Sequence, residues 1–125
     1  MLVISLVQLT SKLHTADPSV AVCKLDDLLN REGKQVELQG CSVAMFRYNR
    51  RVFAIQDQCI DKNCLLSLGT LEKVRGEAHV RCPRHRYFFN LETGECLQLG
   101  HRLPFFPCKI EPDSENILIS FPSED

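Results

Sequence analysis

Short apolar segments separated by turn signals recur along this chain, and none of them is long enough to be a convincing helix. Residues 34–38 alternate between polar and apolar side chains, as a half-buried strand does. Residues 42–46 and 52–55 flank a charged turn at 48–51, which predicts a hairpin. Further strand-like segments lie at residues 78–80, 87–91, 96–99, 109–110 and 117–119, and a turn or two of helix is expected at residues 25–29. The pattern predicts an all-β protein, either a sandwich or a barrel-like stack of sheets.

Length and composition limit the classes of function. At 125 residues the chain has the length of one domain, and its apolar and charged fractions, 44% and 25%, are typical of a globular protein. A net charge of -1 argues against a nucleic-acid partner. No apolar run approaches the length of a membrane span, so no membrane partner is expected. We expect a monomer with an N-terminal arm or first strand over residues 1–19, a folded domain over residues 20–121 and a tail over residues 122–125.

Seven cysteines are many for this length, but an odd number spread along the chain is not typical of a secreted disulfide framework. The N-terminal segment has no basic region and its apolar run is interrupted at Gln8, so it is a weak signal peptide. These features predict a thiol-reducing, cytoplasmic location. Four cysteines lie in or beside strand-like segments and are expected to pack in the core: Cys23, Cys41, Cys96 and Cys108.

Two irregular, polar loops carry the remaining cysteines. The stretch QCIDKNC at residues 58–64 places two thiols and a carboxylate within one short segment, and CPRH at residues 82–85 places a thiol and an imidazole three residues apart. Loops on a rigid β frame are where functional sites tend to lie. Two ligands from each loop would suit tetrahedral zinc or an iron–sulfur cluster.

With these two loops the sequence resembles a Rieske-type domain over about residues 20–121. The segments that carry the resemblance are VCKLDDL at residues 22–28, VFAIQDQC at residues 52–59, Leu66 and Gly69, and CPRHRYFFNLETGECLQL at residues 82–99. Within the family, the sequence is most similar to small soluble Rieske domain-containing proteins of animals and to bacterial Rieske ferredoxins. The resemblance implies a stack of antiparallel sheets with two cluster-binding loops.

Rieske proteins hold a [2Fe–2S] cluster with two cysteines on one iron and two histidines on the other. By resemblance, Cys59 and Cys82 match the thiolate pair, and His85 matches one imidazole ligand. The second histidine should fall at position 61, where this chain has Asp61. This departure from the family pattern decides how the site must be interpreted.

Three interpretations of position 61 remain open. Asp61 itself ligates the outer iron, which would make the oxidised cluster anionic and lower its reduction potential. Alternatively Cys64 or His79 is the fourth ligand; Cys64 falls where respiratory-type members carry a disulfide cysteine, but the partner position holds Arg84, so that disulfide cannot form. In the third interpretation the fold persists without a cluster, as in the Rieske-like small subunit of assimilatory nitrite reductase.

The resemblance implies a one-electron carrier that holds a [2Fe–2S] cluster through Cys59, Asp61, Cys82 and His85, with Cys64 as an alternative fourth ligand. Its partner would be a reductase or a terminal acceptor, and basic residues around the second loop would suit an acidic surface on it: Arg75, Arg81, Arg84 and Arg86. With only four histidines there is no second iron site for oxygenase activity, so catalysis is not expected. The alternatives are a Rieske-fold interaction or structural module without a cluster, and a structural zinc site.

Overall fold

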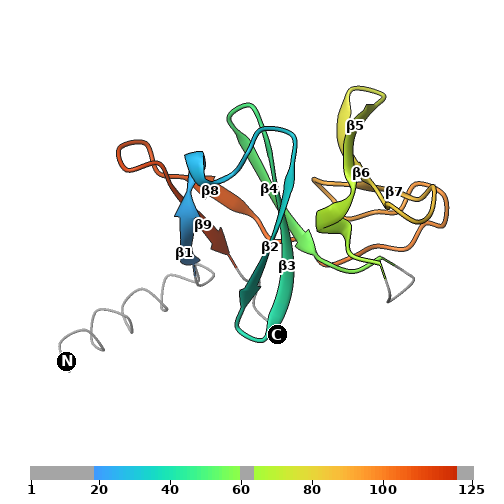
Figure 1. Cartoon of the computed structure of the whole chain (residues 1–125), viewed down its shortest axis with the longest axis horizontal. Coiled ribbons are helices and arrows are strands. Elements are labelled where there is room, and N and C mark those ends of the chain that lie inside the picture. The colour runs from blue at the N-terminus through green and yellow to red at the C-terminus, as the bar shows by residue number, and fades with distance from the viewer. Residues whose placement is uncertain (1–18, 60–63, 121–125) are drawn as a thin grey trace.

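The computed structural model describes residues 19–59 and 64–120, and within these ranges the chain forms nine β-strands in three antiparallel sheets (Figure 1). The first sheet has the order β1-β9-β8, the middle sheet β2-β3-β4 and the third sheet β5-β6-β7. The all-β prediction and the stack of antiparallel sheets are confirmed. The strands are β1 (Ser19–Lys24), β2 (Gly33–Leu38), β3 (Cys41–Tyr48), β4 (Arg51–Gln56), β5 (Thr70–Val74), β6 (Glu77–Arg81), β7 (Phe88–Asn90), β8 (Cys108–Ile110) and β9 (Asn116–Ser120).

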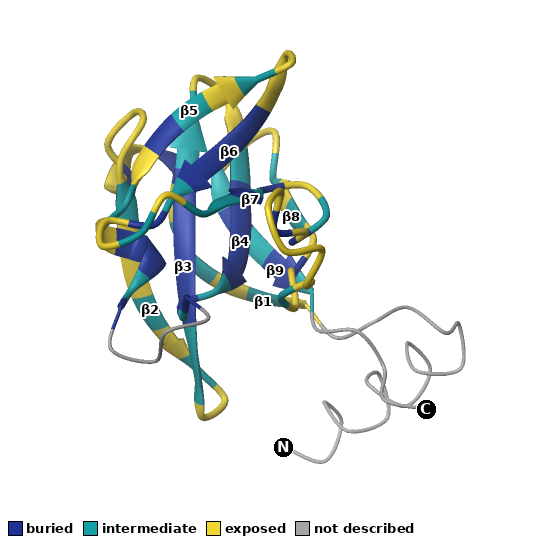
Figure 2. Cartoon of the chain, turned by 90° about the vertical axis from the view of Figure 1, so that its right-hand side faces the viewer, coloured by how far each residue is buried: buried dark blue, intermediate teal, exposed yellow. Residues whose placement is uncertain are grey.

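The middle sheet separates two hydrophobic cores. Successive side chains of a strand point to opposite faces, so Phe46 packs in the core shared with the third sheet while Met45 packs in the core shared with the first sheet. Both side chains are fully buried. Figure 2 shows long buried stretches on β3, β4 and β6, with exposed residues at the turns around them. The sheet therefore packs against a hydrophobic core on each face, because strands β3 and β4 carry apolar side chains on both faces.

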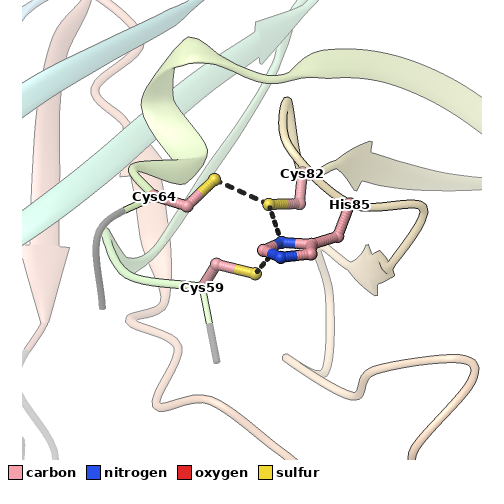
Figure 3. Close-up of side chains that lie close together, drawn as sticks. All are labelled: Cys59, Cys64, Cys82 and His85. Atoms are coloured by element: carbon pink, nitrogen blue, oxygen red, sulfur yellow. Dashed lines mark hydrogen bonds between the residues drawn. The ribbon is translucent and has the colours of Figure 1, made fainter. Parts of the chain in front are cut away.

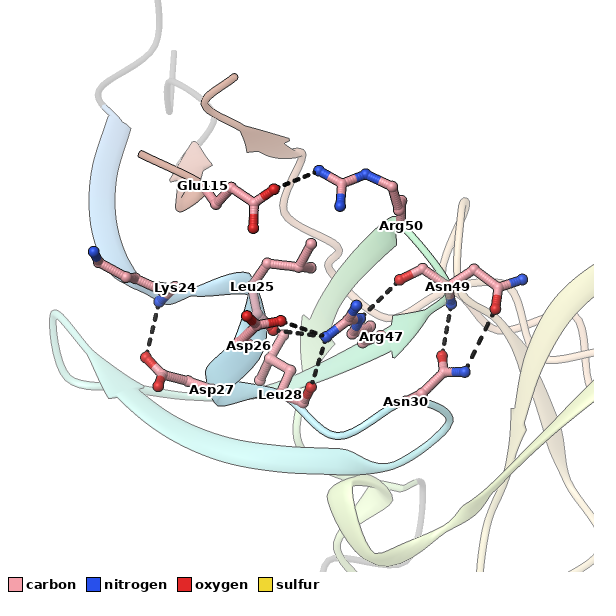
Figure 4. A network of polar contacts seen from close by, with 10 residues as sticks. All are labelled: Lys24, Leu25, Asp26, Asp27, Leu28, Asn30, Arg47, Asn49, Arg50 and Glu115. Atoms are coloured by element: carbon pink, nitrogen blue, oxygen red, sulfur yellow. Dashed lines mark hydrogen bonds and ion pairs between the residues drawn. The ribbon is translucent and has the colours of Figure 1, made fainter. Parts of the chain in front are cut away.

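A network around Arg47 fastens the first sheet to the middle one (Figure 4). One guanidinium nitrogen, Nη1, donates to the carbonyls of Leu25 and Leu28 at 3.2 Å each, and Nε donates to the carbonyl of Asn49 at 2.7 Å. Leu25 begins the short 3₁₀ helix η1 (Leu25–Asp27), and its carbonyl also accepts the Leu28 N–H at 3.0 Å, so Arg47 adds a second hydrogen bond to the end of this turn. The one or two helical turns expected at residues 25–29 are this single 3₁₀ turn.

The third sheet carries the loops that the sequence singled out. Strands β5 and β6 form a hairpin whose turn residues, Arg75 and Gly76, both have positive φ, 54° and 82°. The connection from β6 to β7 contains residues 82–87. The connection from β4 to β5 contains residues 57–69, including the 3₁₀ helix η2 (Leu66–Leu68).

One predicted strand is wrong. Residues 96–99 were expected to continue from residues 87–91 as a hairpin, but Cys96 makes only a single bridge to Phe89. The chain then turns, because the Gly100 N–H donates to the Cys96 carbonyl at 2.9 Å and Gly100 takes a φ of 75°. The glycine that directly follows residues 96–99 allows a turn where alternation alone indicated a strand.

Two strands were not predicted from the pattern, β1 and β5, because neither has a clear polar–apolar alternation in sequence. The expectations for residues 1–18, Asp61 and residues 121–125 lie outside the described residues. In the described part of the chain, no helix has the length and hydrophobicity needed to span a bilayer.

Candidate metal centre

The first ligand loop is anchored by a buried carboxylate. Asp57 follows β4 directly and is 2% exposed, and its oxygens accept hydrogen bonds from the Ser67 N–H and hydroxyl at 2.7 Å each and from Gln35 Nε2 at 2.9 Å. The Cys59 N–H donates to the Cys64 carbonyl at 3.0 Å. These bonds fix both ends of the segment 59–64 to the frame, because they join the end of β4 to the start of η2.

The second ligand loop is the connection between β6 and β7. The Cys82 N–H donates to the Tyr87 carbonyl at 2.9 Å, so the loop closes directly after β6 ends at Arg81. The rings of His85 and Tyr87 stack with their centroids 5.4 Å apart. The stacked tyrosine restricts the orientation of the imidazole that the loop presents.

Gly69 brings the two loops together. A Cβ atom at this position would lie 2.3 Å from the Arg81 carbonyl oxygen and 2.9 Å from a Val80 methyl group. Only a glycine lets the backbone after η2 approach the end of β6 so closely. Because Cys82 follows Arg81, this contact sets the separation between the first and the second ligand loop.

Four side chains from these loops converge (Figure 3). The Cys64 and Cys82 Sγ atoms are 2.7 Å apart, the Cys82 Sγ is 3.5 Å from His85 Nδ1, and the Cys59 Sγ is 4.0 Å from the same nitrogen. One ligand atom from each of Cys59, Cys64, Cys82 and His85 lies within 4.8 Å of all the others. Thiols and an imidazole at this spacing are a donor set for a soft or borderline metal.

Burial and hydrogen bonding act in opposite directions on the thiols. The three cysteines are 1–2% exposed, whereas His85 is only partly buried. Burial raises the pKa of Cys82, but hydrogen bonds from Cys64, Cys59, His85 and the Arg84 backbone outweigh it and lower the pKa to about 7. Burial, followed by the hydrogen bond with Cys82, raises the pKa of Cys64. Cys82 is therefore converted more readily than Cys64 to the thiolate form that binds metals.

The structure brings together three of the four predicted ligands, Cys59, Cys82 and His85, and adds the predicted alternative Cys64. The fourth predicted ligand, Asp61, lies outside the described residues. His79 is buried on β6, where its Nδ1 lies 3.0 Å from the Glu77 carbonyl, and it is not part of the convergent group. Sequence reasoning missed Asp57, although an acidic residue directly between a strand and a cysteine loop is a usable signal.

The other cysteines lie away from the centre. Cys96 is fully buried in the core beside the centre, as expected. Cys23, Cys41 and Cys108 are half-buried and pack against the other core. Burial, together with the nearby Cys23, raises the pKa of Cys108 to about 12, so this thiol stays protonated. Within the described residues, none of the seven cysteines forms a disulfide bond.

Comparisons with known proteins agree with the fold. The Photorhabdus laumondii ferredoxin subunit of 3-phenylpropionate/cinnamic acid dioxygenase is 32% identical over 101 residues, which cover 79% of this chain and 92% of that protein. A crystal structure described as that of an NADPH nitrite reductase small subunit is 30% identical, with a TM-score of 0.75 and coverage of 82% of this chain and 97% of that chain. The ferredoxin of carbazole 1,9a-dioxygenase from Nocardioides aromaticivorans shares the fold, with a TM-score of 0.71 at 22% identity and coverage of 82% and 96%.

A sequence model of the family described as the Rieske-like [2Fe–2S] domain matches residues 19–120, which contain all nine strands and both ligand loops. The chain therefore belongs to the Rieske-like [2Fe–2S] domain family.

Proposed function

We propose that this protein is a one-electron carrier that holds a [2Fe–2S] cluster between the 59–64 and 82–87 loops. The observation that carries the proposal is the convergence of Cys59, Cys82 and His85 from two loops of a Rieske-type frame. Their donor types fit the cluster, which is bound by thiolates and imidazoles in this family. The cluster, when bound, supplies a one-electron redox couple.

Different residues of the site would bind the cluster and transfer the electron. Cys59 and Cys82 would bind one iron as thiolates and His85 would bind the other, with the fourth position falling to Asp61 or Cys64. Because these cysteines are buried, water would be excluded from the iron that they bind. His85, which is only partly buried, would present the edge through which an electron reaches a partner. No catalytic residue is assigned to the chain itself.

The partner would be an oxygenase or reductase component, by analogy with the ferredoxin subunit of the Photorhabdus dioxygenase. The exposed Arg84 and Arg86 flank His85, whereas Arg81 is partly buried and lies 4.0 Å from Glu72. Exposed arginines beside the electron-transfer edge would steer an acidic surface toward it. A reducing, cytoplasmic compartment is part of the proposal, because the centre requires free thiols.

Metal and sulfide analysis tests the carrier proposal. Protein expressed with added iron and purified under anaerobic conditions should contain two irons and two labile sulfides per chain, absorb visible light and give a rhombic EPR signal on reduction. A colourless protein without iron or sulfide would exclude the carrier. One equivalent of zinc in its place would indicate a structural metal site.

Charge reversal tests the partner surface. The double variant Arg84→Glu, Arg86→Glu should slow oxidation of the reduced protein by anionic ferricyanide and speed oxidation by cationic hexaamminecobalt(III), with both effects shrinking at high salt. Reversal of the distant exposed Arg50, which pairs with Glu115 at 2.9 Å, is the control and should change neither rate. Equal rates for all three proteins would contradict a role for the arginines.

A second candidate is an interaction or structural module that keeps the fold without a cluster. It is favoured by the aspartate at position 61 and by the likeness to nitrite reductase small subunits. The same iron and sulfide analysis separates it from the carrier.

A further inference from the structure

Cys64 belongs to a hydrophobic core, but its sulfur lies among the predicted ligands. Its side chain is 2% exposed, and its Sγ lies 2.7 Å from the Cys82 Sγ and within 4.8 Å of the ligand atoms of Cys59 and His85. Figure 3 shows the sulfur directed toward the other three side chains. Cys96, a fully buried cysteine of the same core, provides the contrast, because its Sγ lies 3.8 Å from Gln98 Oε1 and it does not join the group.

The frame holds Cys64 in this position. Its carbonyl accepts the Cys59 N–H at 3.0 Å, and three residues later Ser67 is bound to the buried Asp57. The Arg84 backbone N–H forms a hydrogen bond with the sulfurs of both Cys64 and Cys82. Backbone donors of this kind orient thiolate ligands and tune metal centres. Cys64 is therefore held beside the other members of the group by contacts with the frame.

We infer that Cys64 is the fourth ligand of the metal centre, so that three thiolates and one imidazole bind it and Asp61 does not. The inference rests on the proposed function only in that the two loops hold a metal. Metal–sulfur bonds of about 2.3 Å in tetrahedral geometry place two sulfurs about 3.8 Å apart. The Cys64 and Cys82 Sγ atoms, 2.7 Å apart in the structure, would therefore separate by about 1 Å on binding a metal, which stays within the 4.8 Å spacing of the group. The set thus replaces the missing histidine with a residue already facing the centre.

A third thiolate has a consequence for charge. Two thiolates and two neutral imidazoles balance the 2+ core of an oxidised cluster, whereas three thiolates and one imidazole leave it with one negative charge. Adding an electron to an anionic centre is less favourable, so the reduction potential falls relative to the usual Rieske set. An aspartate ligand would have a similar effect on charge, so the test must count thiolates directly.

Cobalt binding counts the thiolates without requiring a cluster. Metal-free protein titrated with Co²⁺ should show sulfur-to-cobalt charge-transfer absorption, whose intensity grows with each cobalt–thiolate bond. Cys64→Ala should lower this intensity at saturation by about a third, because three thiolates become two. Cys96→Ala and Asp61→Ala should leave it unchanged. Cys64→Ser, which keeps the size of the side chain, repeats the test if the alanine variant does not fold.

Full charge-transfer intensity in a folded Cys64→Ala variant would overturn the inference. Cluster-loaded protein provides an independent reading. Asp61→His alone should leave the reduction potential unchanged, whereas Asp61→His combined with Cys64→Ala should raise it by restoring two thiolates and two imidazoles.

The two proposals fail in different ways. A cluster whose potential rises with Asp61→His alone would overturn the role of Cys64 and leave the carrier standing. Wild-type protein that binds Co²⁺ through three thiolates but takes up no iron or sulfide would support the role of Cys64 and exclude the carrier. Wild-type protein that binds neither would exclude both.

Discussion

The two cores on either side of the middle sheet differ in what their side chains can do. The core shared with the first sheet, here the frame core, is mainly aliphatic: Leu25, Leu28, Val43, Met45, Ala54, Phe106, Ile117 and Ile119. The core shared with the third sheet, here the ligand core, contains the three cysteines of the centre among its buried residues. The same strands, β3 and β4, supply side chains to both.

The difference indicates a division between support and chemistry. The frame core joins strands from both ends of the described chain through the β1–β9 pairing, and it contains no member of the convergent group. The ligand core is built around loops closed by single backbone hydrogen bonds and one buried carboxylate. We therefore expect damage to the frame core to change stability alone, and damage to the ligand core to change both stability and metal binding.

The sharpest test of this division uses two neighbours on β3 that face opposite cores. Phe46→Ala should lower the free energy of unfolding by about 3–5 kcal/mol and also reduce the iron bound per folded chain. Met45→Ala should lower it by about 2–5 kcal/mol and leave the iron content of the folded fraction unchanged. Denaturant unfolding and iron analysis give both values. Equal loss of iron in the two variants would contradict the proposed division between the frame core and the ligand core.

The anchor of the first loop should have a smaller effect on stability. Asp57→Asn replaces an acceptor oxygen with an amide that faces the Ser67 or Gln35 donors, and should cost about 1.5–3 kcal/mol. Metal affinity should fall as well, because the 59–64 loop loses its tie to η2. Asp26→Asn is the control, because the Asp26 side chain is 87% exposed, and its effect should stay within about 0.5 kcal/mol. Unchanged metal affinity in Asp57→Asn would show that the loop is held by its backbone alone.

The frame core should show its own pH dependence at alkaline pH. The pKa of Cys108 is raised from 9.0 to about 12 in the folded protein, so above pH 9 the unfolded chain ionises this thiol while the folded chain does not. The contribution of the protonated Cys108 thiol to the free energy of unfolding is fully present below pH 9. It is lost as the pH rises toward 12, by about 1.4 kcal/mol per pH unit at most. The melting temperature should therefore fall less steeply between pH 9 and pH 11 in Cys108→Ala than in wild type. Parallel curves would contradict the shift, and Cys41→Ala controls for loss of a half-buried thiol.

The exposed ion pair between the middle sheet and the third sheet should have the smallest effect on the free energy of unfolding. Arg51 at the start of β4 pairs with Glu92 in the turn after β7, and both side chains are largely exposed. Arg51→Ala should cost about 0.2–1 kcal/mol, and high salt should reduce the difference from wild type. A larger, salt-independent loss would point instead to the packing of Arg51 over the Phe53 ring, 4.9 Å away.

The sequence by itself determined the fold class and the two loops of the centre. Alternation at residues 34–38 and the charged turn at 48–51 predicted strands of the middle sheet, because that sheet has clear turn signals and apolar central strands. The Cys-x-x-His spacing predicted Cys82 and His85 as partners, since both lie in one short loop. The pattern of polar and apolar residues was misleading at residues 96–99, where the chain forms a turn instead of the expected strand, and it did not reveal β5.

The tertiary structure decided which side chains meet at the centre. The resemblance to the Rieske family assigned Cys59, but Cys64, His79 and Asp61 remained as competing ligands, because residues in two loops are related only through the sheets that carry them. Asp57, Gly69 and the β6–β7 hairpin bring the loops together, and they place Cys64 in the group while His79 remains bound to its own strand. The reason is physical: a ligand set is defined by distances between atoms, and those distances are fixed by hydrogen bonds and close backbone contacts far apart in the chain.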